Sequence, residues 1–429
     1  MRLRVVLAAS VIGILAASAI VASGQRARAF RASRDHPAIA YSTGPVDNVI
    51  ADLNRQIRDG IVRLEPEGPS GYLRSVLNAL EISVESQVAV YSQTSFQATL
   101  ISSKNPRAIY FTDSVAVAWV RGGDILEVAA QDRQQGVVFY MLAQTPTDTP
   151  QFTRNDGCLA CHLSWDTLGV PGLQVLSVAP LSSDPTAYAG GYVTDHRSPL
   201  ERRWGGWYVT GRLGSVSHMG NIEVADVDDP PESSAAAAPQ LELLTTRLNV
   251  DGYLSPHSDV VALMVLEHQA QMTNLITRLG WEARRVMFRE AADPAAFDEL
   301  IAEAAAELVD YLLFVDEPPL TAPVTGSSGF ADQFAARAPR DRRGRSLREF
   351  DLEHRLFRYP CSYMIYTEAF DALPRIAKSA VYERMWEVLS GRAADEPYTR
   401  LTRADRRAIV EILRDTKPGL PAYYQTVSQ

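Results

Sequence analysis

A run of short β-type segments between Val88 and Ala143 constrains the fold of this chain more than any other feature of its sequence. The segments are QVAVYS, QATLIS, AIYFTD, VAVAWV, ILEVAA and GVVFYMLA. They are rich in β-branched and aromatic residues, and turn residues separate several of them. Short strands that are joined by tight turns pair with their chain neighbours in antiparallel order. We therefore expect an antiparallel meander.

Amphipathic helices are predicted on both sides of these segments. Apolar residues recur at helical spacing in 45–60 and in 72–84. After the sheet, Ser258 or Asp259 can cap a long helix. Further helices are expected at residues 297–314, 376–390 and 403–415. The predicted fold class is α+β, with N-terminal helices and an antiparallel sheet followed by a mainly helical C-terminal region.

Two changes of composition divide the chain. The proline-rich connector TPTDTP follows the sheet, and VADVDDPPESSAAAAPQ replaces any periodic apolar pattern with acid, proline and alanine. A chain of 429 residues is long enough for two or three domains. The predicted segments are a leader at 1–24, an α+β domain at 25–150, a ligand-binding segment with two close cysteines at 151–223, a linker at 224–240 and a helical region at 241–429.

The N-terminus has the pattern of a secretory leader. Arg2 and Arg4 precede an apolar run from Val5 to Val21, and small residues follow at 22–24. The run is slightly long for a cleaved signal peptide and slightly short for a full membrane span. We expect an exported, periplasmic protein, and both a cleaved leader and an N-terminal membrane tether stay open.

The charge of the chain excludes some partners. Its formal net charge of -9 argues against nucleic acid and against an anionic membrane surface as the main partner. One basic run, RAPRDRRGRSLR at residues 337–348, departs from this acidic background. It is interpreted either as a solvated loop or as a docking patch for an acidic partner.

The motif Cys158-Leu159-Ala160-Cys161-His162 carries the clearest chemistry in the sequence. Two thiols separated by two residues, with a histidine directly behind, match the geometry of covalent haem attachment. A thioredoxin-like dithiol should follow a strand in a βαβ unit, whereas a proline-rich connector precedes this motif. A structural zinc site needs four ligands, and no second cysteine pair exists. The third cysteine, Cys361, is expected to be a buried small hydrophobe.

The motif resembles that of the c-type cytochromes. The resemblance implies one covalent haem c, with Cys158 and Cys161 as thioether attachment points and His162 as the proximal iron ligand. The strings GCLACHLSWDTLGVPG, TDHRSPLERRWGGWYVTG and HMGN also resemble a family of large exported monohaem cytochrome-like proteins of unassigned function. That wider resemblance covers most of the chain and implies no particular reaction.

The second axial position of the iron would decide between a carrier and a catalyst. Met219, in the glycine-flanked loop SHMGN, is the first candidate, because a histidine and methionine pair raises the reduction potential. His218 in the same loop and His268 in the predicted long helix are the alternatives. Each of these side chains has an ordinary core role as its competing interpretation.

The stretch after the motif offers residues that suit a large apolar cofactor with carboxylate groups. Trp204, Trp207 and Tyr208 could contribute apolar burial, and Arg212 could pair with a propionate. Arg197, Arg202 and Arg203 form a denser positive cluster, which is interpreted either as a partner for propionates or as exposed surface. A packed β-hairpin with a glycine turn explains the same residues without a cofactor.

These observations predict an exported c-type cytochrome that exchanges electrons with a redox partner protein. A haem enzyme of peroxidase or oxidase type is the alternative, and a haem-based sensor is the second. The sequence contains no Ser/His/Asp set, phosphate-binding glycine loop or H-E-x-x-H pattern. It leaves enzymatic activity undecided and favours the carrier. A simple carrier needs only ~100 residues, so most of the chain must have a further role.

Overall fold

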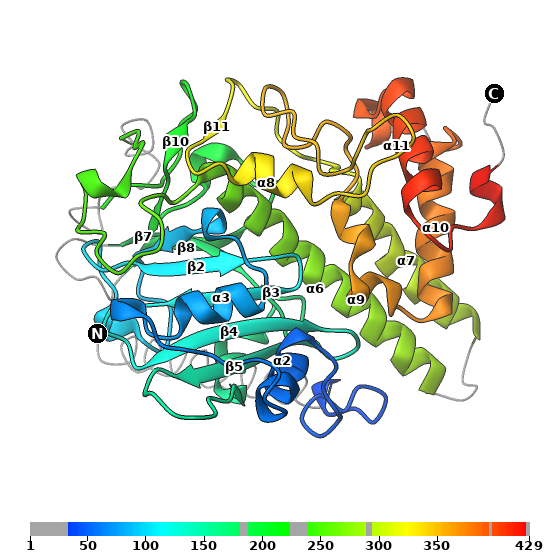
Figure 1. The fold of residues 1–429 in the computed structure, drawn as a ribbon. Coiled ribbons are helices and arrows are strands. Elements are labelled where there is room, and N and C mark those ends of the chain that lie inside the picture. The colour runs from blue at the N-terminus through cyan, green and yellow to red at the C-terminus, as the bar shows by residue number, and fades with distance from the viewer. Residues whose placement is uncertain (1–32, 181–187, 224–238, 289–293, 394–396, 426–429) are drawn as a thin grey trace, which may run out of the picture.

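A seven-stranded antiparallel sheet forms the centre of the computed structural model, which describes residues 33–180, 188–223, 239–288, 294–393 and 397–425 (Figure 1). The strand order is β6-β5-β4-β3-β2-β1-β9. The strands are β1 (Val88–Val90), β2 (Arg107–Phe111), β3 (Val115–Trp119), β4 (Ile125–Asp132), β5 (Gly136–Ala143), β6 (Thr153–Arg154) and β9 (Trp207–Tyr208). The expected antiparallel meander is confirmed by β1 to β5, which pair in chain order.

One predicted strand is wrong. The segment QATLIS contains a short 3₁₀ helix, Ala98–Leu100, in place of a strand. The hydroxyl of Ser95 accepts a hydrogen bond from the Gln97 N–H at 2.9 Å. Such local side-chain bonds offer the backbone an alternative to the sheet, and here the local turn prevails over β propensity.

Helices α2 (Val49–Arg58) and α3 (Leu73–Ala79) cover one face of the sheet. Alternate residues of β4 are buried, as expected of a strand with one covered face. The buried set packs with the helices in one apolar cluster, which includes Ile50, Leu53, Leu73, Leu126 and Val128. Both predicted N-terminal helices are therefore present, although each is shorter than the stretch predicted for it, 45–60 or 72–84.

The long helix α6 (Val260–Phe288) crosses the opposite face of the sheet. Its 29 residues span about 43 Å, and it packs against β1, β5 and β7. In Figure 1 it runs on into the helical region around α7 and α10. The later helices are α7 (Pro294–Leu312), α8 (Phe330–Ala336), α9 (Glu368–Asp371), α10 (Arg375–Leu389) and α11 (Arg403–Thr416). Two further pairs of strands lie outside the main sheet: β7 (Val175–Pro180) with β8 (Tyr188–Thr194), and β10 (Gly211–Arg212) with β11 (Thr325–Gly326).

The segments predicted at 25–150, 151–223 and 241–429 do not have separate cores, because each of the two apolar clusters contains residues from all three. Strand β9 comes from the second segment and pairs with β1 of the first. Helix α6 comes from the third and packs on both. The predicted leader at 1–24 and nearly all of the linker at 224–240 lie outside the described residues. Within the described part, no helix is both long enough and apolar enough to span a bilayer.

Helix α6 buries polar side chains along its length, and they bond several segments that are far apart in the sequence. Glu267 is fully buried and contacts the Arg203 guanidinium, with 3.3 Å between Arg203 Nη1 and Glu267 Oε2. The other contacts are His268 with His196 and Ser362, Gln269 with the Thr112 carbonyl, Asn274 with Leu173, and Thr277 with Gln131. Buried polar groups are costly unless they are paired, so these contacts specify one position for the helix.

Replacing Arg203 by methionine should lower the free energy of unfolding by about 3–5 kcal/mol, because the buried Glu267 carboxyl loses its cation. Arg203 also donates to the carbonyls of His196 and Ser198, which would lose a partner. The matched control is Arg212→Met, since Arg212 and its partner Glu242 are 75% and 72% exposed. We expect Arg212→Met to lower the free energy of unfolding by only about 0–1 kcal/mol. Urea unfolding followed by circular dichroism measures the free energy of unfolding of both variants. Equal losses of stability would contradict the stabilising role of the buried Arg203–Glu267 contact.

Candidate functional site

The cysteine motif lies on one helical turn directly after the edge of the sheet. Strand β6 pairs with β5, and Asn155 then ends the strand by accepting a hydrogen bond from the Gly157 N–H at 2.8 Å. The turn continues into the short helix α4 (Leu159–His162). Residues three apart on a helix share a face, so the two cysteines lie on the same side of this turn. Cys158 is half-buried and Cys161 is exposed.

The imidazole of His162 is held by a backbone carbonyl. His162 Nδ1 lies 3.0 Å from the Gly172 carbonyl oxygen. Burial lowers the pKa of His162 to about 4, so the ring is neutral at pH 7. A carbonyl only accepts, so Nδ1 must carry the proton and Nε2 has the lone pair. The ring also packs against Phe139 of β5, with 4.7 Å between the ring centroids.

The two other predicted uses of the motif fit this geometry poorly. A redox dithiol needs a lowered thiol pKa, whereas burial and the nearby Glu127 carboxylate raise the pKa of Cys158 to about 11. Zinc would need four ligands. Within the described ranges, no three His, Cys, Asp or Glu side chains are grouped to hold a metal ion.

A surface of small side chains on the sheet adjoins Phe139, the residue whose ring contacts His162. Ala129 of β4 is opposite Phe139, and Ala116 of β3 is opposite Ala129. Both alanines are partly exposed on this face of the sheet. The sheet therefore presents small side chains beside Phe139, which suits a planar apolar group.

A buried ion pair, which the sequence analysis did not find, borders this surface. Arg107 Nη1 of β2 lies 3.1 Å from Glu127 Oε2 of β4, and the side chains are 17% and 15% exposed. Arg107 Nε is buried without a hydrogen-bond partner. Both charges act on the pKa of His162, which places them near it. In the sequence, the signal that could have located this ion pair is the single charged residue in each of two mostly apolar segments, RAIYF and ILEVAA.

Two large side chains next to the motif are exposed to solvent. Phe96 is 60% exposed and Trp165 is 65% exposed. A Cβ built on Gly157 would lie 3.2 Å from the Phe96 ring, so this ring flanks the cysteine turn. Trp165 follows His162 by three residues. The outer edge of the motif therefore carries aromatic surface that another molecule can reach.

The structure does not bring Met219 and His218 into contact with His162. Their loop is tied to the β9 side of the sheet, since the Met219 N–H donates to the Arg203 carbonyl at 2.9 Å. Four strands separate β9 from β5, or about 24 Å along a regular sheet. Both side chains are buried, and the His218 ring faces Trp204 at 5.4 Å between centroids. No hydrogen bond or ring contact of the described residues joins them to His162.

His268, the other predicted alternative, has both ring nitrogens engaged. His268 Nδ1 lies 2.8 Å from His196 Nδ1, and His268 Nε2 lies 2.7 Å from Ser362 Oγ. The ring is fully buried and stacks on Phe314 with 4.5 Å between centroids. Iron ligation by His268 would require one of these hydrogen bonds to break.

The residues proposed around the cofactor have other contacts in the structure. Arg197 pairs with Asp195 at 3.0 Å, and Arg212 pairs with Glu242 at the surface. Trp204 is fully buried, and the Trp207 indole N–H donates to the Leu176 carbonyl at 2.9 Å. The glycines of the WGGW string permit this packing, because a Cβ on Gly205 would lie 2.2 Å from the Val178 carbonyl oxygen of β7.

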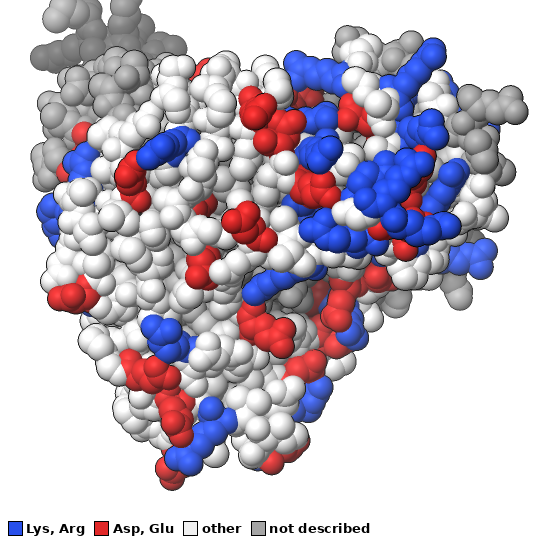
Figure 2. All heavy atoms as spheres, turned by 45° about the horizontal axis from the view of Figure 1, so that its top comes forward, with Lys and Arg blue, Asp and Glu red and all other residues white. Residues whose placement is uncertain are grey.

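The basic run is fastened to helix α11. Arg342 pairs with Asp415 at 2.7 Å, and Arg343 and Arg345 both pair with Glu411. The guanidinium groups of Arg342 and Arg343 are 88% and 64% exposed, whereas these acids are about 20% exposed. Figure 2 shows the resulting dense group of basic side chains on one part of the surface. The basic run is therefore an ordered, outward-facing positive surface. That it binds an acidic partner stays a prediction.

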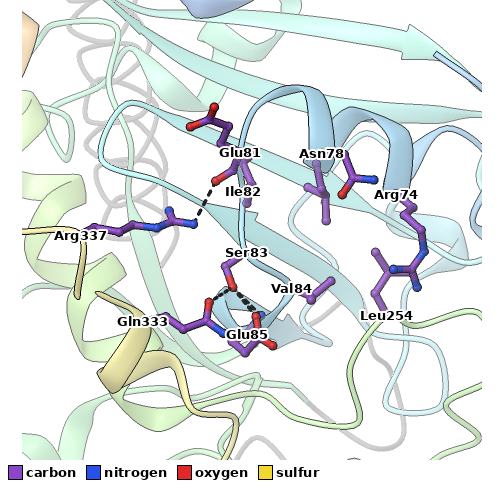
Figure 3. Close-up of a pocket in the computed structure, with 11 residues that line it drawn as sticks. Arg74, Asn78, Glu81, Ile82, Ser83, Val84, Glu85, Leu254, Gln333 and Arg337 are labelled. Carbon is purple, nitrogen blue, oxygen red and sulfur yellow. Dashed lines mark hydrogen bonds between the residues drawn. The ribbon is translucent and has the colours of Figure 1, made fainter. Parts of the chain in front are cut away.

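A polar hollow of about 360 Å³ lies elsewhere, between α3 and α8 (Figure 3). Arg74, Asn78, Glu85, Gln333 and Arg337 are among its lining residues. Its side chains bond one another across the opening, and the Arg337 guanidinium donates to the Glu81 carbonyl. None of its lining residues belongs to the cysteine motif.

Comparison with protein-family models, with curated proteins and with solved structures found no match. The arguments about this site therefore rest on its own residues.

The chain without a bound cofactor should lose stability as the pH falls from about 6.5 toward 4. Burial lowers the pKa of His162 and His218 to about 4, whereas an unfolded histidine titrates near 6.5. Below 6.5 the unfolded chain therefore binds protons that the folded chain excludes, and folding weakens. In a Cys158→Ala, Cys161→Ala background, adding His162→Gln should reduce the stability difference between pH 7.5 and pH 5 by up to about 2 kcal/mol.

Urea unfolding at the two pH values tests this pH dependence. The control is His354→Gln, because His354 is 80% exposed. An equal effect of the two substitutions would argue against a buried neutral His162.

Proposed function

We propose that the chain is an exported c-type cytochrome, with one haem bound covalently through Cys158 and Cys161 and with His162 as an axial ligand. The observation that supports it best is the hydrogen bond between His162 Nδ1 and the Gly172 carbonyl. It fixes the tautomer in which Nε2 is free to ligate. A ligating histidine almost always donates its other ring N–H in this way.

The residues around the motif suit this cofactor. The half-buried Cys158 and the exposed Cys161 are both free thiols on one side of a helical turn. Small side chains lie beside Phe139 on the sheet, and Arg107 Nε, which has no hydrogen-bond partner in the described residues, offers a donor to a carboxylate. A bound haem would supply one-electron chemistry. The chain itself orients the imidazole and keeps it neutral.

Electron transfer to or from a redox partner protein is the function that this arrangement favours. A carrier needs one edge of its cofactor within reach of a partner. Cys161 is exposed, and Phe96 and Trp165 place aromatic surface next to it. Aromatic residues are enriched in protein interfaces.

Met219 remains the proposed second axial ligand, with His218 and His268 as alternatives. Among the described residues its thioether has no competing hydrogen bond, whereas His268 bonds through both ring nitrogens. Ligation by Met219 requires its loop to approach the motif more closely than it does in this structure.

Replacing both Cys158 and Cys161 by alanine should abolish covalent haem, because both thioether bonds are lost. The readout is haem-dependent staining of the purified protein on a denaturing gel. Cys361→Ala is the matched control, since Cys361 is fully buried in the core away from the motif and should leave the stain unchanged. Stain that survives in the double variant would overturn the proposed function.

The visible and near-infrared spectra should show a low-spin iron with a weak sulfur-to-iron band, without binding of cyanide or carbon monoxide. Met219→Ala should remove that band and open the iron to ligands. Met141→Ala is the control, because the Met141 sulfur accepts a hydrogen bond from Asn155 Nδ2 at 2.9 Å and lies beside the motif. A high-spin iron that binds ligands in the unaltered protein would favour the enzyme or the sensor.

A further inference from the structure

Helix α6 reaches the backbone segment that contacts His162. Asn274 is fully buried on this helix. Its Oδ1 accepts a hydrogen bond from the Leu173 N–H at 2.9 Å, and its Nδ2 donates to the Leu173 carbonyl at 2.8 Å. The amide thus satisfies both backbone groups of one residue. Only one orientation of the side-chain amide can do this, because the donor and acceptor must match.

The carbonyl of the preceding residue, Gly172, holds the His162 imidazole. Gly172 precedes Leu173, and its carbonyl accepts from His162 Nδ1 at 3.0 Å. Its N–H donates to the His162 carbonyl, also at 3.0 Å. A Cβ on Gly172 would lie 2.1 Å from Asn274 Oδ1, so the helix side chain packs directly against this residue.

The same segment is fixed from its other side by the sheet. The Val137 N–H of β5 donates to the Pro171 carbonyl at 2.9 Å. Residues 171–173 are therefore held at one end by the sheet and at the other by Asn274. The Gly172 carbonyl lies between these two fixed points, so its direction depends on both.

We infer that Asn274 is a positioning residue for His162, which acts by holding the Gly172 carbonyl on the imidazole N–H. The inference rests on the proposed function in that the imidazole would be an iron ligand. A hydrogen bond from Nδ1 makes a ligating imidazole more electron-rich and stabilises the oxidised iron. Loosening the carbonyl should therefore raise the reduction potential.

Asn274→Leu tests this role, because leucine keeps a similar volume and loses both hydrogen bonds. The reduction equilibrium should shift toward the reduced form by up to about tenfold, which is ~59 mV for one electron. The matched control is Gln269→Leu. Gln269 is another buried polar residue of α6, and it bonds the Thr112 carbonyl and Tyr363 away from this segment. The control should lose stability to a similar degree and keep the potential of the unaltered protein.

A second measurement does not depend on haem. In the Cys158→Ala, Cys161→Ala chain, ¹⁵N chemical shifts of His162 at neutral pH should report a proton on Nδ1. Asn274→Leu should move part of that proton to Nε2, and Gln269→Leu should not. An unchanged tautomer in Asn274→Leu, or equal changes in the two variants, would overturn the inference. Absence of covalent haem from the unaltered protein would instead overturn the proposed function and leave the NMR result to decide the role of Asn274.

Discussion

The fold depends on the satisfied polar groups of one buried helix. Helix α6 is enclosed by the sheet, the β7–β8 pair and the C-terminal region, and its buried polar side chains bond all three. Thr277 bonds Gln131 of the sheet, Glu267 bonds Thr194 of β8, and His268 bonds Ser362. An apolar helix could slide or rotate at modest cost, since dispersion contacts are not directional. Unpaired buried polar groups cost several kcal/mol, so this helix has one register. The sheet, the β7–β8 pair and the later helices, which pack on α6, are therefore also fixed in position relative to it.

The properties of the cysteine turn follow from this arrangement more than from the motif itself. The motif supplies the two thiols and the imidazole, but the neutral ring and its tautomer come from burial against Phe139 and from the Gly172 carbonyl. The same burial raises the pKa of the Cys158 thiol. An exposed copy of the same five residues would have neither property.

The sequence predicted the local elements well and the long-range contacts poorly. Segments rich in β-branched and aromatic residues, separated by turn residues, located β1 to β5. Apolar residues at helical spacing located the helices α2, α3, α6, α7, α10 and α11, because that spacing records which face is buried. QATLIS failed because a serine hydroxyl closed a turn. Asn274 and Arg107 were missed because their partners lie far from them in the sequence, although a charge within an apolar strand marks Arg107. Asn274 meets Leu173 across 101 positions of chain, and Arg107 meets Glu127 only through strand pairing.

The distance in sequence between the motif and α6 orders the events of biogenesis. If the chain is exported and matured as proposed, with its N-terminus entering the export channel first, the cysteine turn emerges while the helix that will fix its histidine is still about one hundred residues behind. Until then residues 171–173 have only the sheet as a partner, and the thiols remain outside any completed core. Any enzyme that modifies the cysteines therefore meets a pliable segment for a limited interval. Docking of α6 ends that interval, so the rate at which this helix forms its contacts sets the time available for maturation.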